Sequence, residues 1–142
     1  FFSNTDAGGK KIIDRINQQE NFLKIPNMLS TDFLSLMHYA SLMIGNSSAG
    51  IREAPSFKLP TINIGSRQNG RLRANNVIDV NHNVDEIEKA LIKVLYDNKF
   101  KESLMDLENP YGNGHAAKQI VDVLQNIELT KELIQKEICY DI

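Results

Sequence analysis

Short apolar runs alternate with stretches of helical periodicity along this chain. Runs of strand length, bounded by polar or turn-forming residues, predict strands at 21–26, 41–45, 59–65 and 76–80, and Phe1-Phe2 fits the end of a further strand. Helical spacing of apolar residues predicts helices at 5–19, 30–40, 49–57, 83–98, 114–127 and 129–142. Such alternation is typical of a parallel sheet covered by helices on both faces, so the α/β class is expected.

The sequence also predicts which residues cap the helices and which face the core. Asp6 is expected to cap the first helix, and Ser30 or Thr31 the second. The inward residues expected on the second helix are Phe33, Leu34, Met37 and Tyr39. The apolar residues of the 83–98 helix, which has the clearest pattern, are Val84, Ile87, Leu91, Val94 and Leu95.

Composition limits the classes of protein that remain. The 142 residues suffice for one domain with a core, and 42% hydrophobic with 24% charged residues is ordinary for a soluble protein. A net charge of -2 without a basic run argues against nucleic-acid binding, and no apolar run is long enough to span a membrane. A lone cysteine, Cys139, and no signal-peptide pattern lead us to expect a cytoplasmic location. Because the chain opens on Phe1-Phe2 without a methionine, a fragment of a longer protein is expected.

Polar and flexible residues follow the predicted strand at 41–45. In an open parallel sheet, ligands bind at the carboxyl ends of strands, where a helix N-terminus offers unpaired N–H groups to phosphate. Gly45 permits a turn, Ser47 and Ser48 can add hydroxyl donors, and Gly50 leaves room for a ligand at the backbone. Glu53 lies over a turn further on, where its carboxylate could accept hydrogen bonds from the two hydroxyls of a ribose.

The next predicted strand ends in a similar loop. Gly65, Ser66, Arg67 and Gln68 follow it, with two more arginines close behind, and arginine binds phosphate through two parallel hydrogen bonds. Each loop alone has a plainer interpretation, a serine cap with a first-turn acid in one case and a solvated basic loop in the other. Two phosphate-compatible strand ends in succession favour an anionic ligand.

Three motifs, in order along the chain, carry a family resemblance. They are "SNTDAGGKKI" at 3–12, "MIGNSSAGIREAPSFKLPTINIGSRQNGRLRANNVI" at 43–78, and "NPYGNGHAAKQI" at 109–120. Together they resemble the hydrolysing UDP-N-acetylglucosamine 2-epimerases over nearly the whole chain. That family is similar in fold to the two-domain GT-B-type glycosyltransferases. The resemblance implies that residues 1–142 form the second, C-terminal domain, a Rossmann-like domain that binds UDP.

The same resemblance implies an activity for the parent protein. UDP would leave UDP-N-acetylglucosamine or a related UDP-sugar by elimination, and water would add to give the 2-epimer, such as N-acetylmannosamine, for sialic-acid-type synthesis. The carboxylates of this chemistry belong to the first domain, and a histidine lies just before "FSNTDAG". His38, His82 and His115 do not match that position. No catalytic residue is therefore expected here, and the isolated domain should be inactive. Its expected partners are the missing first domain and a second copy of the parent protein.

The family's binding residues transfer to matching positions of this sequence. Ser47 and Ser48 match the serines that hold the diphosphate, Glu53 matches the glutamate on the ribose, and Arg67 matches an arginine near the phosphates.

Two further positions match at the ends of the first two predicted strands. Asn4 matches an asparagine at the first strand end. Met28 and Leu29 match the segment whose backbone meets uracil, where a Val-Pro pair can occur in relatives. The 109–120 motif is expected near the cleft between domains, with no direct catalytic role. No cluster of His, Cys and Asp has the spacing of metal ligands, so neither a metal nor another cofactor is expected.

Two alternatives remain at this stage. One is a nucleotide-sugar-binding domain of a GT-B glycosyltransferase, which would also place a glutamate over the ribose. The other is a stand-alone UDP-sugar-binding module, against which the start inside a strand argues.

Overall fold

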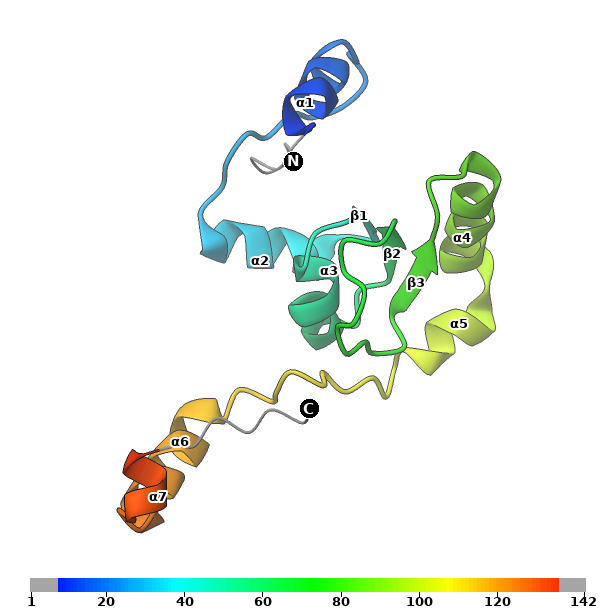
Figure 1. Cartoon of the computed structure of the whole chain (residues 1–142). Coiled ribbons are helices and arrows are strands. Elements are labelled where there is room, and N and C mark those ends of the chain that lie inside the picture. Colours follow the sequence, from blue (N-terminus) through cyan, green and yellow to red (C-terminus); the bar gives the residue numbers. More distant parts are fainter. Residues whose placement is uncertain (1–7, 136–142) are drawn as a thin grey trace, which may run out of the picture.

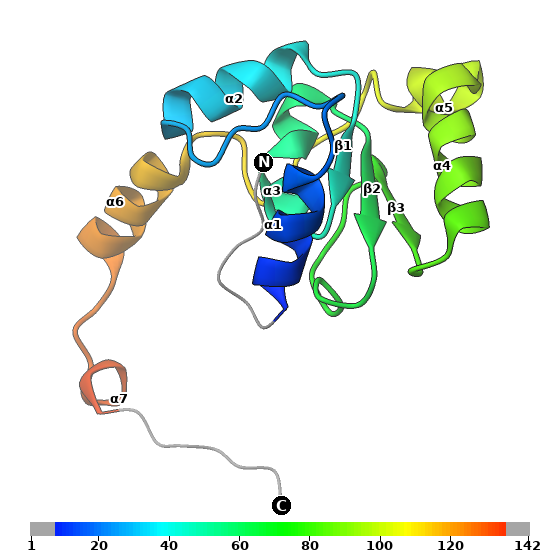
Figure 2. The ribbon, with the colours of Figure 1, turned by 90° about the horizontal axis from the view of Figure 1, so that it is seen from above.

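A three-stranded parallel sheet forms the centre of the computed structural model, which describes residues 8–135 (Figure 1). The strands β1 (Met43–Gly45), β2 (Thr61–Ile64) and β3 (Val77–Val80) lie in that order, as Figure 2 shows. Met43 pairs with Thr61, which pairs in turn with Val77. The carboxyl ends of all three strands therefore lie at one edge, and the predicted α/β class with a parallel sheet is confirmed.

One face of the sheet packs against α4 (Val84–Tyr96) and α5 (Asn98–Ser103). Side chains alternate across a strand, so Ile62 and Ile64 of β2 face this layer while Thr61 and Asn63 face the other. Ile62 packs with Ala90, Val94 and Phe100, and this cluster is the larger part of the core. Burial of these apolar side chains is what holds the helices on the sheet.

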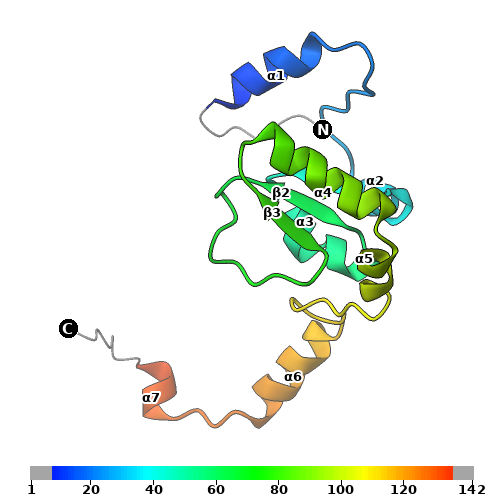
Figure 3. The ribbon, with the colours of Figure 1, turned by 90° about the vertical axis from the view of Figure 1, so that its right-hand side faces the viewer.

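The other face is covered by α2 (Ser30–Tyr39), α3 (Ala49–Arg52) and the 3-10 helix η1 (Ala54–Phe57), and Figure 3 shows α3 and α4 on opposite sides of the strands. Gly50 lets α3 lie directly on β2, because a Cβ at Gly50 would meet Thr61 Cγ2 at 2.4 Å. The fully buried Asn76 then ties this layer to the sheet, since its side-chain amide donates to the carbonyls of Gly50 (3.4 Å) and Leu59 (2.8 Å). Helix α3 is thus held in a fixed position over the strand ends.

The remaining helices lie outside these layers. Helix α1 (Gly9–Asn17) precedes the long connection to α2, while α6 (Ala116–Asn126) and α7 (Lys131–Ile134) extend away from the sheet (Figure 1). No residue of α6 is buried, although the helix carries an apolar face. Within residues 8–135, no helix is both long and apolar enough to cross a membrane.

Several predicted elements differ from the structure. Residues 21–26 form no strand, and Leu23 in this segment is 86% exposed, because an extended run becomes a strand only when a neighbouring strand pairs with it. The predicted 49–57 helix is divided into α3 and η1, since Pro55 lacks the N–H that would continue an α-helix. Helix α5 was not predicted. It is short, and Asp97 caps it by accepting from Phe100 N–H (3.1 Å).

The predicted caps and inner faces were also partly wrong. Helix α2 begins after Leu29, not at a Ser30 or Thr31 cap, and Tyr39 at its end is 84% exposed. Val84, at the start of α4, is exposed as well, because the first turn of that helix extends beyond the sheet that the later turns cover. Helix α1 begins after Gly8, which has a φ of 88°. The expected Asp6 cap and the Phe1-Phe2 strand end lie outside the described residues, as does the end of the predicted 129–142 helix.

Candidate functional site

The two loops that the sequence singled out meet at the carboxyl edge of the sheet. Asn46 follows β1, and Arg67 and Gln68 follow the neighbouring strand β2. The carbonyl oxygen of Asn46 accepts hydrogen bonds from Gln68 Nε2 (2.7 Å) and from Arg67 Nη1 (3.2 Å). The structure therefore brings Arg67 to the loop that carries Ser47 and Ser48.

Two backbone donors of the serine loop have no acceptor in the part of the chain that the structure describes. Ser47 Oγ accepts from Ala49 N–H (3.3 Å), and Ser48, at the N-cap position of α3, makes no side-chain cap bond. Among residues 8–135, the backbone N–H groups of Ser47 and Ser48 donate no hydrogen bond. Because α3 has only four residues, its dipole is small, and attraction of an anion here depends on these individual donors and on Arg67. The expected helix dipole therefore contributes less than the sequence suggested.

Glu53 lies at the other end of α3, six residues beyond Ser47. Six residues of helical chain advance roughly 9 Å, so Glu53 lies beyond the serines, as a ribose lies beyond a diphosphate. The side chain is half-buried, and its enclosed Oε2 atom has no hydrogen-bond partner in the described part of the chain. Buried acceptors are nearly always satisfied, so this oxygen calls for a partner that the described residues do not supply.

Gly50 has a different environment from the one the sequence suggested. The space that its missing side chain leaves is filled by Thr61, so Gly50 serves the packing of α3 on β2. Its N–H donates to the Ser47 carbonyl (3.3 Å). A direct contact of Gly50 with a ligand stays a prediction.

A polar network behind the loops was not anticipated from the sequence. Gln68 is 1% exposed, and its main-chain carbonyl accepts a hydrogen bond from Arg73 Nη2 (3.0 Å). Arg73 Nε also pairs with Asp79 Oδ2 (2.8 Å), and Asp79 Oδ1 accepts from Asn63 Nδ2 (2.6 Å). The available signal was a polar residue inside each of two short apolar runs, Asn63 in "TINI" and Asp79 in "VIDV".

The "NPYG" loop holds both sides of the site in place. Asn109 Nδ2 donates to the carbonyl of Arg52 (2.8 Å) and to Ser56 Oγ (2.7 Å), on either side of Glu53. Tyr111 Oη donates to the carbonyl of Leu72 (3.0 Å) in the loop after β2. The sequence singled out this motif but did not show which elements it would join.

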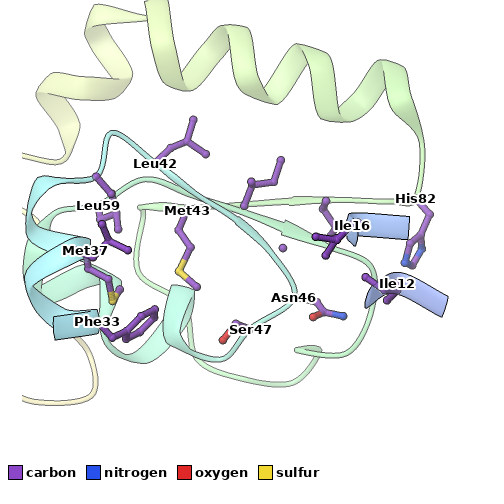
Figure 4. A pocket seen from close by; sticks show the side chains of 15 residues that line it. Ile12, Ile16, Phe33, Met37, Leu42, Met43, Asn46, Ser47, Leu59 and His82 are labelled. Carbon is purple, nitrogen blue, oxygen red and sulfur yellow. The ribbon is translucent and has the colours of Figure 1, made fainter. Parts of the chain in front are cut away.

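A cavity of about 570 Å³ lies beside β1, between α1 and α2. Its walls are mostly apolar, and Asn46, Ser47 and His82 contribute polar atoms to its lining (Figure 4). Of the predicted binding residues that the structure describes, Ser47 alone lines this cavity. Met28 and Leu29 lie just before α2 and take no part in it, and Asn4 lies outside the described residues.

The histidines form no common site in the part of the chain that the structure describes. His38 has an edge contact with Phe57 (6.3 Å between centroids), the His82 ring lies against Gly65, and His115 is exposed at the start of α6. No group of three or more His, Cys, Asp or Glu residues within 8–135 is placed to hold a metal ion.

Comparison with known proteins gives this arrangement a family. A family model described as UDP-N-acetylglucosamine 2-epimerase matches residues 1–125. The UDP-N,N'-diacetylbacillosamine 2-epimerase (hydrolyzing) of Legionella pneumophila is 35% identical over 94% of this chain, and the polysialic acid biosynthesis protein P7 of Escherichia coli is 34% identical over 99%. The chain covers 35% and 36% of these two proteins, so it spans about a third of the length of the curated relatives it matches.

A solved structure supports the fold independently. The S. aureus MnaA–UDP co-structure superposes with a TM-score of 0.65 and 21% sequence identity, over 85% of this chain and 33% of that chain. The chain therefore belongs to the UDP-N-acetylglucosamine 2-epimerase family.

Proposed function

We propose that this chain is the UDP-binding part of a hydrolysing 2-epimerase that acts on UDP-N-acetylglucosamine or a related UDP-sugar. The observation that carries the proposal is the junction of the two strand-end loops, where Arg67 donates to the carbonyl of Asn46, and the N–H groups of the next two residues, Ser47 and Ser48, donate to no described residue. Oriented N–H groups next to a guanidinium suit a diphosphate. Family membership favours this reading over a glycosyltransferase domain of similar fold.

Most of the predicted binding residues take a role in this proposal. Ser47, Ser48 and Arg67 hold the diphosphate, and the Glu53 carboxylate, whose Oε2 has no partner among the described residues, accepts from the ribose diol. The backbone at Met28 and Leu29 contacts uracil in this proposal. In the described structure neither residue lines the cavity to which Ser47 contributes.

In the proposed reaction UDP leaves by elimination, and water then adds to release the 2-epimer with free UDP. The described residues of this chain hold the leaving group, and the proton is removed by a group in the remaining part of the parent protein. The word "hydrolyzing" in the name of the Legionella relative supports this subtype, and the polysialic acid relative supports a role in sialic-acid-type synthesis.

Titration of the 142-residue chain with UDP, followed by NMR, tests the site. We expect a dissociation constant of about 0.1–1 mM, since only part of a cleft is present, with shifts concentrated at Ser47 and Ser48. Uridine should bind more weakly because it lacks the diphosphate. If UDP moved no signal near these two serines, the site assignment would be wrong.

Product analysis with the full-length protein tests the subtype. A hydrolysing enzyme converts UDP-N-acetylglucosamine to free N-acetylmannosamine and UDP, whereas a non-hydrolysing one keeps the sugar attached to UDP. Anomeric proton signals separate the two products. A UDP-linked 2-epimer as the final product would contradict the hydrolysing assignment and leave UDP binding intact.

A further inference from the structure

The peptide group between Asn46 and Ser47 is held by a residue to which no role in binding has been assigned. Gln68 is almost completely buried, and its Nε2 atom donates to the Asn46 carbonyl at 2.7 Å. A trans peptide is planar, with its C=O and N–H on opposite sides. With the carbonyl directed at Gln68, the Ser47 N–H faces the opposite way, where it donates to no described residue.

Gln68 is itself anchored to the sheet. Arg73 Nη2 donates to the main-chain carbonyl of Gln68 (3.0 Å), while Arg73 Nε pairs with Asp79 (2.8 Å). Asp79 also accepts from Asn63 (2.6 Å), its register partner on the neighbouring strand. A continuous chain of hydrogen bonds thus links the rigid centre of the sheet to the serine loop.

We infer that Gln68 is a positioning residue for the diphosphate, which acts by orienting the Asn46–Ser47 peptide so that the Ser47 N–H points at the phosphate oxygens. This inference rests on the proposed function, because it requires a phosphate-bearing ligand at Ser47. Arg67 can also donate to the Asn46 carbonyl, but its guanidinium is the group expected to contact the phosphates. Gln68 is the buried one of these two donors, so it holds the peptide from within the fold.

Gln68→Met in the full-length protein removes the donor and preserves the length of the side chain. We expect the affinity for UDP to fall by about 5- to 10-fold, the effect of one hydrogen bond. The affinity for uridine, which has no phosphate, should stay within about twofold of wild type. Calorimetric titration with each ligand measures this split. Asn69→Met, at the next and exposed position, is the control and should leave both affinities unchanged.

Arg73→Lys is a second variant in case Gln68→Met does not fold, which circular dichroism would show. Lysine cannot contact Asp79 and the Gln68 carbonyl at once, so UDP affinity should fall by about 2- to 5-fold with uridine affinity unchanged. The double variant should be no weaker than Gln68→Met alone, because both act through one peptide.

Equal losses for UDP and uridine, or no loss for either, would overturn the positioning role and leave the proposed function standing. If the wild-type protein bound uridine as tightly as UDP, or bound neither, the proposed function and this inference would fail together.

Discussion

Glu53 and Gly50 lie one turn apart and shape the site in different ways. Glu53 contributes an enclosed oxygen without a partner among the described residues. Gly50 contributes the absence of a side chain, because any Cβ there would meet Thr61. Glu53 is the residue proposed to bind the ribose, and Gly50 determines where the helix that carries Glu53 can lie.

Replacing Glu53 by alanine in the full-length protein should weaken UDP binding by at least about 10-fold. The reason is that a carboxylate accepts charge-assisted hydrogen bonds of roughly 1.5–3 kcal/mol each from the ribose hydroxyls. Calorimetry with UDP measures the loss, and Glu88→Ala on the exposed face of α4 is a matched control. Wild type should bind a 2′,3′-dideoxy analogue of UDP more weakly than it binds UDP. Glu53→Ala should bind the analogue and UDP with the same affinity. Additive losses would show that Glu53 does not touch the diol.

Gly50→Ala should destabilise the fold by about 1–3 kcal/mol, since the new methyl group would lie 2.4 Å from Thr61 Cγ2. Urea unfolding measures the change. Thr61→Ser removes the methyl group that clashes, so Gly50→Ala should cost less in the Thr61→Ser background. An equal cost in both backgrounds would mean that this contact does not place α3.

Among the helices, α4 has the most complete cap. Asn83 Oδ1 accepts from Glu86 N–H (3.1 Å). Glu86 in turn accepts from the Asn81 N–H (2.9 Å) and from the Asn81 side-chain amide (3.1 and 3.3 Å). Together these bonds to Asn81 and Asn83 fix the turn between β3 and α4, and with it the carboxyl end of β3.

This cap predicts a pH dependence of stability. Hydrogen bonds from the Asn81 backbone and then from its side chain lower the pKa of Glu86 below its ordinary value of 4.5, with a smaller contribution from Lys89. Because the folded-state pKa is lowered, ionised Glu86 stabilises the fold above pH 4.5, and this contribution is lost as the pH falls through the folded-state pKa. Urea unfolding from about pH 6 to about pH 3 should show a smaller acid loss for Glu86→Gln than for wild type. Glu88→Gln on the same helix is the control, and an identical acid loss in wild type and Glu86→Gln would contradict the cap.

The whole chain spans about a third of the length of the curated relatives it matches. In the proposed site, Ser47, Ser48 and Arg67 contact the leaving diphosphate, and no described residue is assigned the removal of a proton from the sugar. Elimination requires both a base and stabilisation of the leaving group. The site therefore fits one half of the proposed chemistry.

The 142-residue chain should accordingly release no UDP from UDP-N-acetylglucosamine. A coupled assay for free UDP measures this, with a Ser47→Ala/Ser48→Ala variant as the background. In the full-length protein, Arg67→Ala should lower turnover more than substrate affinity, because negative charge builds on the diphosphate as the bond breaks. Sustained release by the isolated chain above the double-serine background would show that its active site is complete.

Local pattern was enough to predict the three observed strands to within two residues at each end. Each of them is a short apolar run with turn-forming neighbours, and a nearby partner strand satisfies its backbone. The 21–26 run has the same pattern but forms no strand, because no neighbouring strand within residues 8–135 pairs with it. Whether a partner strand is present depends on other parts of the chain. The α2 cap was misplaced for a related reason: hydroxyl side chains at 30 and 31 suit a cap locally, but the helix already begins with them.

The sequence by itself determined the parallel α/β class, the polar strand ends and the family resemblance, because periodicity, turn residues and motifs depend on neighbours within a few positions. Only the tertiary structure decided that Gln68 would meet the Asn46 carbonyl, that Arg73 would pair with Asp79, and that Gly50 would face Thr61. The Gln68–Asn46 and Gly50–Thr61 contacts join residues 22 and 11 positions apart, and the Arg73–Asp79 pair joins residues six positions apart across the turn into β3. Which atoms meet in this way follows from strand order and register, and these are set by the packing of the whole sheet.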